Sequence, residues 1–380
     1  MTEVPMIERV RRRLAADASD PTAHSVAEAL RAENQLAGSD TVLALVDQLR
    51  SETRGAGLLD PLLALPGVTD VLVNGPDAVY VDRGRGLEMS VVRFADEAEV
   101  RRLAQRLAAQ AGRRLDDASP WVDARLGDGT RLHAVLAPLA RPGTALSLRV
   151  PARRTFTLEQ LHAVGSLSDE ALTCLRRIVA SRTAFVISGG TGSGKTTLLA
   201  ALLGAVDPHE RIVVVEDSTE LRPDHPHVVG LEARPANVEG AGLVTVRDLV
   251  RQALRMRPDR LVVGEVRGAE VVDLLAALNT GHEGGCGTVH ANAPADVPAR
   301  FEALGVAAGM PRDAVHSQFA SSIELVIHLA RRSDGRRVVE QVAVTDRAHD
   351  GMVSCHTALD FAPDGARAGP GHPRLVEVLR

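Results

Sequence analysis

The sequence predicts an α/β protein in which a larger domain built on a parallel sheet follows a smaller mixed α+β domain and a short helical segment. Over residues 158–380, strands rich in Val and Ile alternate with helical segments, a pattern typical of a doubly wound parallel sheet. Residues 55–150 instead contain short strand candidates around one amphipathic helix. Aromatic residues make up only 2% of the chain, so Val, Leu, Ala and Ile must fill the cores, which favours helices packed on a parallel sheet.

Residues 1–54 are expected to form a helical appendage, because apolar residues recur three to four positions apart in stretches separated by Asp/Pro or Gly/Ser breaks. In the domain that follows, the one clear helix is predicted near residues 96–111. Its apolar stripe consists of Val100, Leu103, Leu107 and Ala111. Residues 151–157 combine proline and charge without periodicity, and they are the predicted linker to the second domain.

Composition excludes several classes of function. The chain has 380 residues and a formal net charge of −5, so the protein as a whole does not attract DNA or an anionic membrane. One Trp, one Tyr and six Phe leave little material for aromatic platforms that bind single-stranded nucleic acid. Three scattered cysteines, Cys174, Cys286 and Cys355, argue against a disulfide framework. No apolar run has the length of a signal peptide or a membrane span, and we therefore expect a cytoplasmic protein.

A phosphate-binding loop is predicted at residues 189–196, where the pattern GxxxxGKT lies between an apolar strand and an apolar helix. The glycines let backbone N–H groups surround phosphate oxygens, and the helix N-terminus adds its positive dipole end. Lys195 would contact the β and γ phosphates, and the Thr196 hydroxyl would bind Mg²⁺. The predicted nucleotide-binding residues are Gly189, Gly190, Thr191, Gly192, Ser193, Gly194, Lys195, Thr196 and Thr197.

Two further strands end in acidic residues. Glu216, Asp217 and Glu220 follow the apolar run "RIVVV", and Glu265 follows "LVVG". Because the carboxyl ends of parallel strands face the ligand crevice, these carboxylates can hold the Mg²⁺ shell or orient an attacking water. Each acid taken alone could also be a solvated residue that caps the next helix.

With these residues in place, the chain resembles the secretion ATPases of the type II/type IV superfamily, which power pilus assembly, secretion and conjugation. The similarity runs from about residue 60 to residue 345. Residues 189–196 match the Walker A motif, "VVVEDSTEL" the Asp box, "LVVGEVRG" the Walker B motif and "TGHEGGCGTVHAN" the His box. The stretches "DLVRQALRMRPDRLVVGEVRG" and "VDARLGDGTRLHAVLAPLA" look specifically like the tight-adherence (Tad/Flp) pilus and conjugal-transfer branch. The resemblance implies that the second domain is a RecA-like P-loop NTPase domain.

The resemblance also implies roles for individual residues. The expected catalytic set is Lys195, Glu220, Glu265, Arg267, His282, His290, Arg131 and Arg149. Glu220 would polarise the attacking water, and Glu265 would lie on the side of Mg²⁺ and the γ-phosphate with Arg267 beside it. The two histidines would sense the γ-phosphate and relay the nucleotide state to a neighbouring subunit. The remaining two arginines would approach the phosphates in trans, and surface salt bridges are the alternative role for that pair.

By the same resemblance, six copies form a ring that uses ATP and Mg²⁺ and passes a rigid-body movement to an integral membrane platform protein. The protein would then lie peripherally at the inner face of the cell membrane, with no direct contact to nucleic acid. Several members of the family carry a tetracysteine zinc module, which the three cysteines of this chain cannot supply. No zinc is therefore expected.

The His box could also be interpreted as a metal site, because His282, Cys286 and His290 recur every four residues. That spacing aligns side chains only on a helix, and the stretch "EGGCG" is a poor helix interior at about 1 kcal/mol per glycine. The glycines instead favour close backbone approach, and "CGTVHAN" resembles a buried strand that ends at the nucleotide crevice. Cys286 is then a small core residue.

Two other functions remain as alternatives. A hexameric helicase or DNA translocase would share the phosphate loop, but the acidic charge balance and the low aromatic content argue against it. A regulatory module that binds ATP with little hydrolysis is the second alternative. The pair Glu220 and Glu265 argues against that module, because both carboxylates suit hydrolysis.

Overall fold

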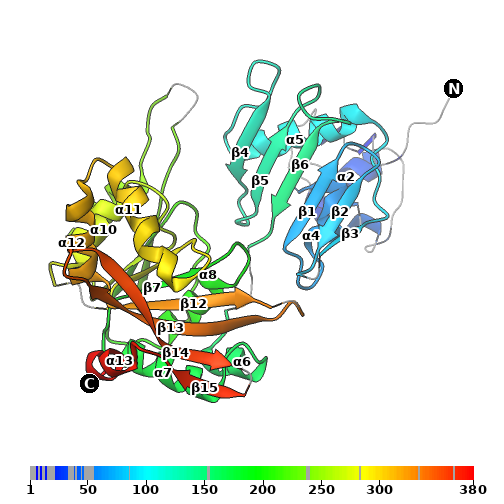
Figure 1. Cartoon of the computed structure of the whole chain (residues 1–380). Helices are drawn as coiled ribbons and strands as arrows, with labels where there is room; N and C mark the ends of the chain where they lie inside the picture. The colour runs from blue at the N-terminus through cyan, green and yellow to red at the C-terminus, as the bar shows by residue number, and fades with distance from the viewer. Residues whose placement is uncertain are drawn as a thin grey trace. The chain divides into compact units, whose positions relative to one another are not determined.

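The structure is a computed structural model that describes residues 55–84, 86–151, 155–236, 240–281, 284–332, 334–362 and 364–380, together with residues 6, 9–10, 13–14, 22–32, 38, 41–43 and 45–46. The chain divides into two compact units, residues 1–152 and 153–380, and Figure 1 shows the elements of each. The predicted linker includes residues 152–154, which lie outside the described residues. No helix of the described part is long and apolar enough to cross a membrane.

The first unit contains a six-stranded antiparallel sheet in the order β3-β2-β1-β6-β5-β4. Its strands are β1 (Asp70–Asn74), β2 (Val79–Asp82), β3 (Leu87–Met89), β4 (Trp121–Arg125), β5 (Arg131–Val135) and β6 (Ala145–Arg149). The short elements η1 (Gly57–Leu59) and α4 (Asp60–Leu63) precede the sheet. Before these, α2 (Ala23–Ala32) buries Val26, Ala29 and Leu30 in a separate small cluster.

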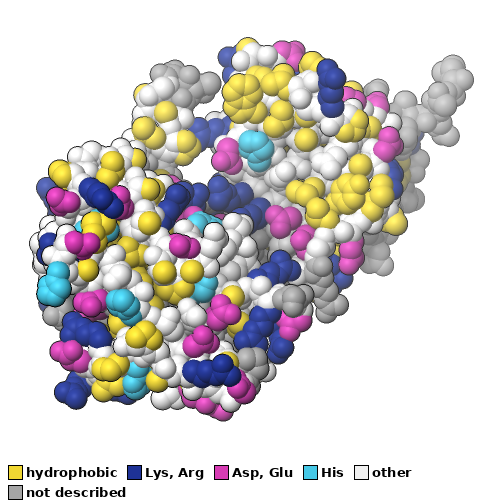
Figure 2. All heavy atoms as spheres, in the orientation of Figure 1, with side chains coloured by type: hydrophobic (Ala, Val, Ile, Leu, Met, Phe, Trp, Pro, Cys, Tyr) yellow, Lys and Arg dark blue, Asp and Glu magenta, His cyan; other side chains and the backbone are white. Residues whose placement is uncertain are grey.

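One helix, α5 (Glu97–Gln110), packs on the sheet of the first unit, and it confirms the helix predicted near residues 96–111. The Asp96 side chain caps its N-terminus by accepting a hydrogen bond from the backbone N–H of Glu99. Strand residues alternate between this core and the other face, as in β1. Leu87, Met89 and Trp121 are exposed, and Figure 2 shows hydrophobic side chains gathered on the visible face of this unit.

The second unit contains a nine-stranded mixed sheet in the order β15-β14-β13-β12-β7-β11-β10-β8-β9. Its strands are β7 (Phe185–Gly189), β8 (Ile212–Glu216), β9 (Val228–Glu232), β10 (Arg260–Val263), β11 (Cys286–Val289), β12 (Leu325–Arg331), β13 (Arg337–Arg347), β14 (Val353–Ala362) and β15 (Gly365–Ala368). The six strands from β12 to β9 in this order are parallel. The α/β class predicted from the sequence is confirmed.

Helices cover both faces of this sheet (Figure 1). Along the chain they are α6 (Leu158–Ala163), α7 (Asp169–Ala180), α8 (Lys195–Gly204), α9 (Val246–Ala253), η2 (Leu254–Met256), α10 (Glu270–Leu278), η3 (Pro294–Asp296), α11 (Val297–Ala307), α12 (Arg312–Ser322) and α13 (His372–Val378). Alternate residues of the strands enter two separate cores, so Ile212 and Val214 pack on one side of β8 while Val213 and Val215 pack on the other. This burial on both faces explains the continuous Val and Ile runs of the sequence.

The sequence predicted a parallel sheet and did not predict that β13, β14 and β15 extend it as antiparallel strands. Short turns join these strands, and one of them closes through the hydrogen bond from Ala348 N to the carbonyl of Met352. A parallel strand needs a crossover of a dozen or more residues, which the C-terminal part of the chain does not provide between these strands.

A buried ion pair lies at the amino end of β10. Arg260 is 2% exposed, and its Nε donates to Oε2 of Glu210 at 2.7 Å while one terminal nitrogen donates to the carbonyl of Val179 at 2.8 Å. Glu210 is 7% exposed. Breaking such a pair on one side leaves an uncompensated buried charge.

We therefore predict that Glu210→Ala lowers the free energy of unfolding by about 3–5 kcal/mol, measured by urea unfolding. The double variant Glu210→Leu/Arg260→Met should lose less than the single variant, because neither charge then remains. A single variant within about 1 kcal/mol of the wild type would contradict the structural role of the pair.

Candidate active site

The loop at residues 189–194 connects β7 to α8 in the strand, loop and helix order that the sequence predicts. Gly192 and Gly194 have φ values of 70° and 99°, which L side chains rarely adopt. A Cβ on Gly189 would lie 2.5 Å from the carbonyl oxygen of Leu329. The Oγ of Ser193 is buried and has no hydrogen-bond partner among the described residues. Glycine is therefore required at three positions, and the loop holds an unsatisfied polar group.

Lys195 begins α8 and its side chain turns back onto the loop. Its Nζ donates to the carbonyl oxygens of Gly189 and Gly190, each at 2.9 Å, and lies 3.5 Å from Nδ1 of His290. The residue is 7% exposed, and burial lowers the pKa of Lys195 while the nearby Glu265 raises it. The Lys195 ammonium therefore lies against the loop. A bound anion would form a stronger, charged hydrogen bond with it than the two carbonyl oxygens do.

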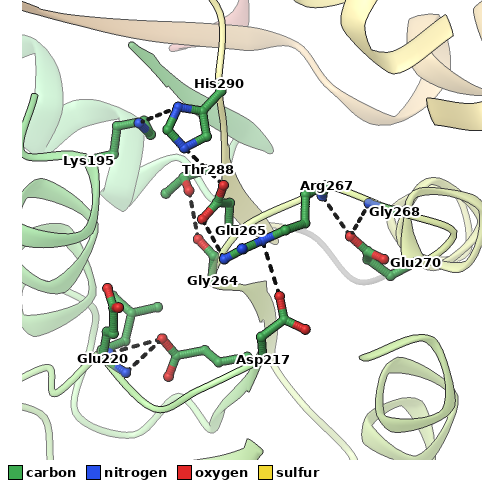
Figure 3. Close-up of polar contacts among 12 residues, drawn as sticks. Lys195, Asp217, Glu220, Gly264, Glu265, Arg267, Gly268, Glu270, Thr288 and His290 are labelled. Atoms are coloured by element: carbon green, nitrogen blue, oxygen red, sulfur yellow. Dashed lines mark hydrogen bonds and ion pairs between the residues drawn. The ribbon is translucent and has the colours of Figure 1, made fainter. Parts of the chain in front are cut away.

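A chain of charged contacts extends from Lys195 across the end of the sheet (Figure 3). The Nε2 of His290 lies 2.9 Å from Oε1 of Glu265, and a terminal nitrogen of Arg267 donates to Oε2 of the same carboxylate at 2.8 Å. The Nε of Arg267 lies 3.1 Å from Oδ2 of Asp217. Arg267 is about half exposed, so each of these pairs adds at most about 1 kcal/mol.

The protonation of His290 follows from its neighbours. Burial lowers the pKa of His290, Lys195 lowers it further, and Glu265 opposes both effects. Because an ammonium can only donate, Nδ1 accepts from Lys195 and the proton lies on Nε2, which donates to Glu265. The imidazole thus joins the lysine of the loop to the carboxylate after β10.

A buried carboxyl, Glu216, fixes the segment that carries Glu220. Its Oε1 accepts the backbone N–H groups of Glu220 at 3.1 Å and of Leu221 at 3.0 Å. A Cβ on Gly264 would lie 2.6 Å from Cγ of Glu216, so the end of β10 closes over this side chain. Burial raises the pKa of Glu216 to about 7, although the two N–H groups act in the opposite direction.

Two further contacts fix the segment after β10. The Thr288 hydroxyl donates to the carbonyl of Gly264 at 2.7 Å. The carboxylate of Glu270 accepts the backbone N–H groups of Arg267 and Gly268, both at 2.7 Å. Glu265 therefore projects from a backbone that is held on both sides, while its own side-chain contacts stay partly exposed.

The structure brings most of the predicted second-unit residues to one edge of the sheet. Thr196 and Thr197 lie in the first turn of α8 and are half-buried. His282 lies outside the described residues, and its predicted role is untested. Arg131 and Arg149 belong to the first unit, where they are directly opposite each other on β5 and β6.

The strand predicted from "CGTVHAN" is confirmed as β11. Cys286 begins this strand and is 1% exposed, whereas His290 follows its carboxyl end. Within the described residues, no group of three or more His, Cys, Asp or Glu side chains could hold a metal ion. Because Cys286 lies on this strand and His290 directly follows it, the four-residue spacing between them is not that of a helix.

Two residues near the loop were missed by the sequence analysis. Arg337, the first residue of β13, donates from Nε to the carbonyl of Gly192 at 2.8 Å. His328 on β12 lies with Nδ1 2.9 Å from the Ser188 hydroxyl, and burial lowers the pKa of His328. Both residues lie far from the Walker A motif in the sequence and belong to no motif, so only the strand pairing of the C-terminal part could have indicated them.

The chain is similar to a known protein family and to several named proteins. Residues 52–367 match the family described as type II/IV secretion system protein. Over 326 residues the chain is 60% identical to a Mycobacterium tuberculosis protein with the provisional name conjugal transfer protein, covering 84% of this chain and 92% of that protein. It is 32% identical over 313 residues to the type IV secretion system protein PtlH of Bordetella pertussis, covering 74% and 92%.

A solved structure of the ATPase DotB of Legionella pneumophila has the same fold. The TM-score is 0.53 at 22% identity, and the similarity covers 76% of this chain and 79% of that one.

The buried carboxyl predicts a pH effect on stability. The folded protein holds a proton on Glu216 up to about pH 7, whereas the unfolded chain releases it near the ordinary glutamate pKa of 4.5. We predict that the stabilisation from this group is complete below about pH 4.5 and is lost as the pH rises through about 7.

Glu216→Gln cannot ionise but keeps an oxygen for the two N–H groups, so it should lack this part of the pH dependence. Urea unfolding at pH 5.5 and 8 measures the difference, with Glu88→Gln on the exposed strand β3 as control. Equal pH dependence in wild type and Glu216→Gln would show the account of this carboxyl to be wrong.

Proposed function

Because the chain belongs to the type II/IV secretion system protein family, we propose that it is an ATP-hydrolysing motor that powers secretion, pilus assembly or conjugal transfer as a ring of six copies. The observation that carries this proposal is the position of Lys195 between the phosphate loop and the pair of His290 and Glu265. A cation, a carboxylate and an imidazole at the carboxyl edge of a parallel sheet are the groups that phosphoryl transfer to water requires.

The residues of the loop fit a nucleotide. Gly192 and Gly194 have the positive φ values that a loop curling around phosphate oxygens requires, and the buried Ser193 hydroxyl would gain a partner. In this proposal the Lys195 ammonium leaves the carbonyls of the loop and binds the β and γ phosphates. We propose that the second unit is a RecA-like ATPase domain on this basis.

Magnesium fits the same edge, because the Thr196 hydroxyl and the Glu265 carboxylate are oxygen ligands of the kind that Mg²⁺ prefers. Bound with ATP, the ion neutralises charge on the phosphates. Glu220 would accept a hydrogen bond from the attacking water and polarise it, while Glu216 holds its backbone in place. Arg267 lies beside Glu265 and would stabilise negative charge on the transferred group.

The roles of the remaining residues concern communication between copies. We propose that His290, together with His282, senses the γ-phosphate, because its imidazole lies beside Lys195, where it could hydrogen-bond a terminal phosphate. Arg131 and Arg149, on paired strands of the first unit, would bind the phosphates of a neighbouring copy. The ring would act on an integral membrane platform protein from the inner face of the membrane.

The second candidate is a ring-shaped DNA translocase, which the conjugal-transfer names of the relatives favour. The net charge of −5 and the aromatic content of 2% oppose it. Single-stranded DNA should leave the rate of phosphate release unchanged if the first proposal holds, and strong stimulation would favour the translocase.

The catalytic assignment predicts different defects for two variants. Lys195→Ala should abolish ATP binding, whereas Glu220→Gln should bind ATP but hydrolyse it about 100-fold more slowly, because a positioned base contributes 10²–10⁴-fold. Phosphate release and ATP titration measure the two effects, and Glu159→Gln is a matched control because this exposed carboxylate pairs only with Arg176 among the ion pairs of the described residues. Full turnover in Glu220→Gln would remove the assignment.

The sensor role predicts a change in nucleotide discrimination. His290→Ala should alter the ratio of ATP to ADP affinity by about tenfold, because one hydrogen bond near a charged group is lost only where the γ-phosphate is present. Isothermal titration with both nucleotides, using Glu220→Gln to prevent turnover, gives this ratio. The role would be refuted by an unchanged ratio together with an unchanged rate of hydrolysis.

A further inference from the structure

A buried polar pair lies at the start of the phosphate loop. Ser188 is the residue before Gly189 on β7, and its hydroxyl oxygen lies 2.9 Å from Nδ1 of His328 on β12. Ser188 is fully buried, and His328 is 5% exposed. On the same side of these two strands, the neighbouring residues Val186 and Val326 belong to an apolar core. The pair is thus a polar contact at the edge of an apolar core.

The stability of the sheet does not explain this pair. Removing one partner of a buried hydrogen bond leaves the other unsatisfied, but replacing both partners by apolar groups of similar shape is nearly neutral or stabilising. The three residues of β7 before Ser188 are all apolar and buried. Two apolar side chains would suit the core equally well, which points to the adjacent loop as the reason for the pair.

The pair lies on a rung of residues that spans three parallel strands. Ser188 pairs with His328 of β12 on one side and with Val289 of β11 on the other. Gly189, which begins the loop, and His290 directly follow this rung on their strands. A shift of the rung would therefore move both of these residues.

The backbone of Gly189 connects the rung to the charged network. Its carbonyl accepts a hydrogen bond from Nζ of Lys195 at 2.9 Å. A Cβ at this position would lie 2.5 Å from the carbonyl oxygen of Leu329, so the backbone is in close contact with β12. Binding groups must be held within about 0.5 Å of their productive geometry, and the contacts that anchor this backbone therefore affect how the loop binds phosphate.

A β-bulge lies beside the same histidine. In the pairing of β12 with β13, His328 is opposite Gln341. The next residue along β12 is opposite Val339, so Glu340 is the extra residue of the bulge. Bulges re-aim side chains and are over-represented next to active sites. The irregularity of the sheet thus coincides with the residue that contacts the end of β7.

The imidazole of His328 forms this contact without a charge. Burial lowers the pKa of His328. Glu340 and Asp296 raise this pKa, and Lys195 lowers it further. The ring is therefore neutral at neutral pH, and its Nδ1 forms a hydrogen bond between two neutral groups. A neutral amide at the same point could replace it.

We propose that His328 is a positioning residue of the nucleotide site: through Ser188 it fixes the end of β7, so that Gly189 and the loop that follows are held in the form that binds phosphate. The inference rests on the proposed function, because it concerns the same loop. It adds a residue outside the four motifs of the sequence, and it assigns the buried pair to ligand binding rather than to stability.

The double variant Ser188→Ala/His328→Leu separates these two roles. It removes both polar partners together, so its urea midpoint should equal or exceed that of the wild type. Isothermal titration should nevertheless show the affinities for ADP and for tripolyphosphate reduced by about tenfold each, because the loop loses one anchoring hydrogen bond. Tripolyphosphate has no nucleoside, so its affinity reports on the phosphate loop.

His328→Asn is the conservative variant. The Asn amide ends near the position of Nδ1 and can still bond the Ser188 hydroxyl, so both affinities should return close to those of the wild type. His316→Leu is the matched control for a buried histidine elsewhere, because Nδ1 of His316 accepts from Val353 N at 3.0 Å. This control should lower the urea midpoint and leave both affinities unchanged.

Several results would overturn the positioning role. They are unchanged affinities in the double variant, a loss in His328→Asn equal to that of the double variant, or a loss for ADP with tripolyphosphate unaffected. A lower urea midpoint together with weaker binding in the double variant would also overturn it, since the pair would then serve general packing.

The same titrations distinguish this inference from the proposed function. If the wild type binds neither ADP nor tripolyphosphate, the proposed function fails. If the wild type binds both and the double variant binds them equally well, only the role of His328 fails.

Discussion

The parallel pairing of β7, β11, β10 and β8 is the constraint on which the rest of the site depends. It brings the carboxyl ends of four strands to one edge, although Lys195 and His290 are separated by 95 positions in the sequence. Each strand is buried on both faces, so its end cannot move without disturbing a core. Strand β12 extends the parallel array, β13 pairs antiparallel with it, and the two supply a second wall for the phosphate loop through Leu329 and Arg337.

The contacts of the site form two layers, which differ in burial: the first layer holds the backbone, and the second joins side chains that can change partners. Buried contacts hold the backbone: Glu216 binds the segment of Glu220, Thr288 binds Gly264, and Glu270 caps the turn after Arg267. The contacts of Arg267 and His290 with Glu265 are partly exposed and individually weak. In our account, a bound phosphate rearranges this second layer while the first layer stays fixed. The energy for a conformational step then comes from exchanging weak internal ion pairs for stronger contacts with the nucleotide.

The sequence predicted the parts of the site that depend on local pattern. Gly194 and Lys195 lie in an unmistakable motif, and Glu216 and Glu265 end Val-rich strands, so both positions followed from strand periodicity. The glycines around Cys286 correctly indicated a strand. Arg337 and the antiparallel strands could not be predicted, because they depend on which distant segments pair. The roles proposed for His282, Arg131 and Arg149 concern contacts with the nucleotide and with neighbouring copies of the chain, and they stay predictions.

The central claim is that the carboxyl edge of this sheet hydrolyses ATP with Mg²⁺. Steady-state phosphate release by the purified protein, with ATP and Mg²⁺ and then with the metal removed by a chelator, tests it most directly. The account predicts saturable release that stops on chelation and returns when Mg²⁺ is restored. Tight ATP binding without Mg²⁺-dependent release would contradict the account and identify the protein as a module that binds nucleotide without turnover.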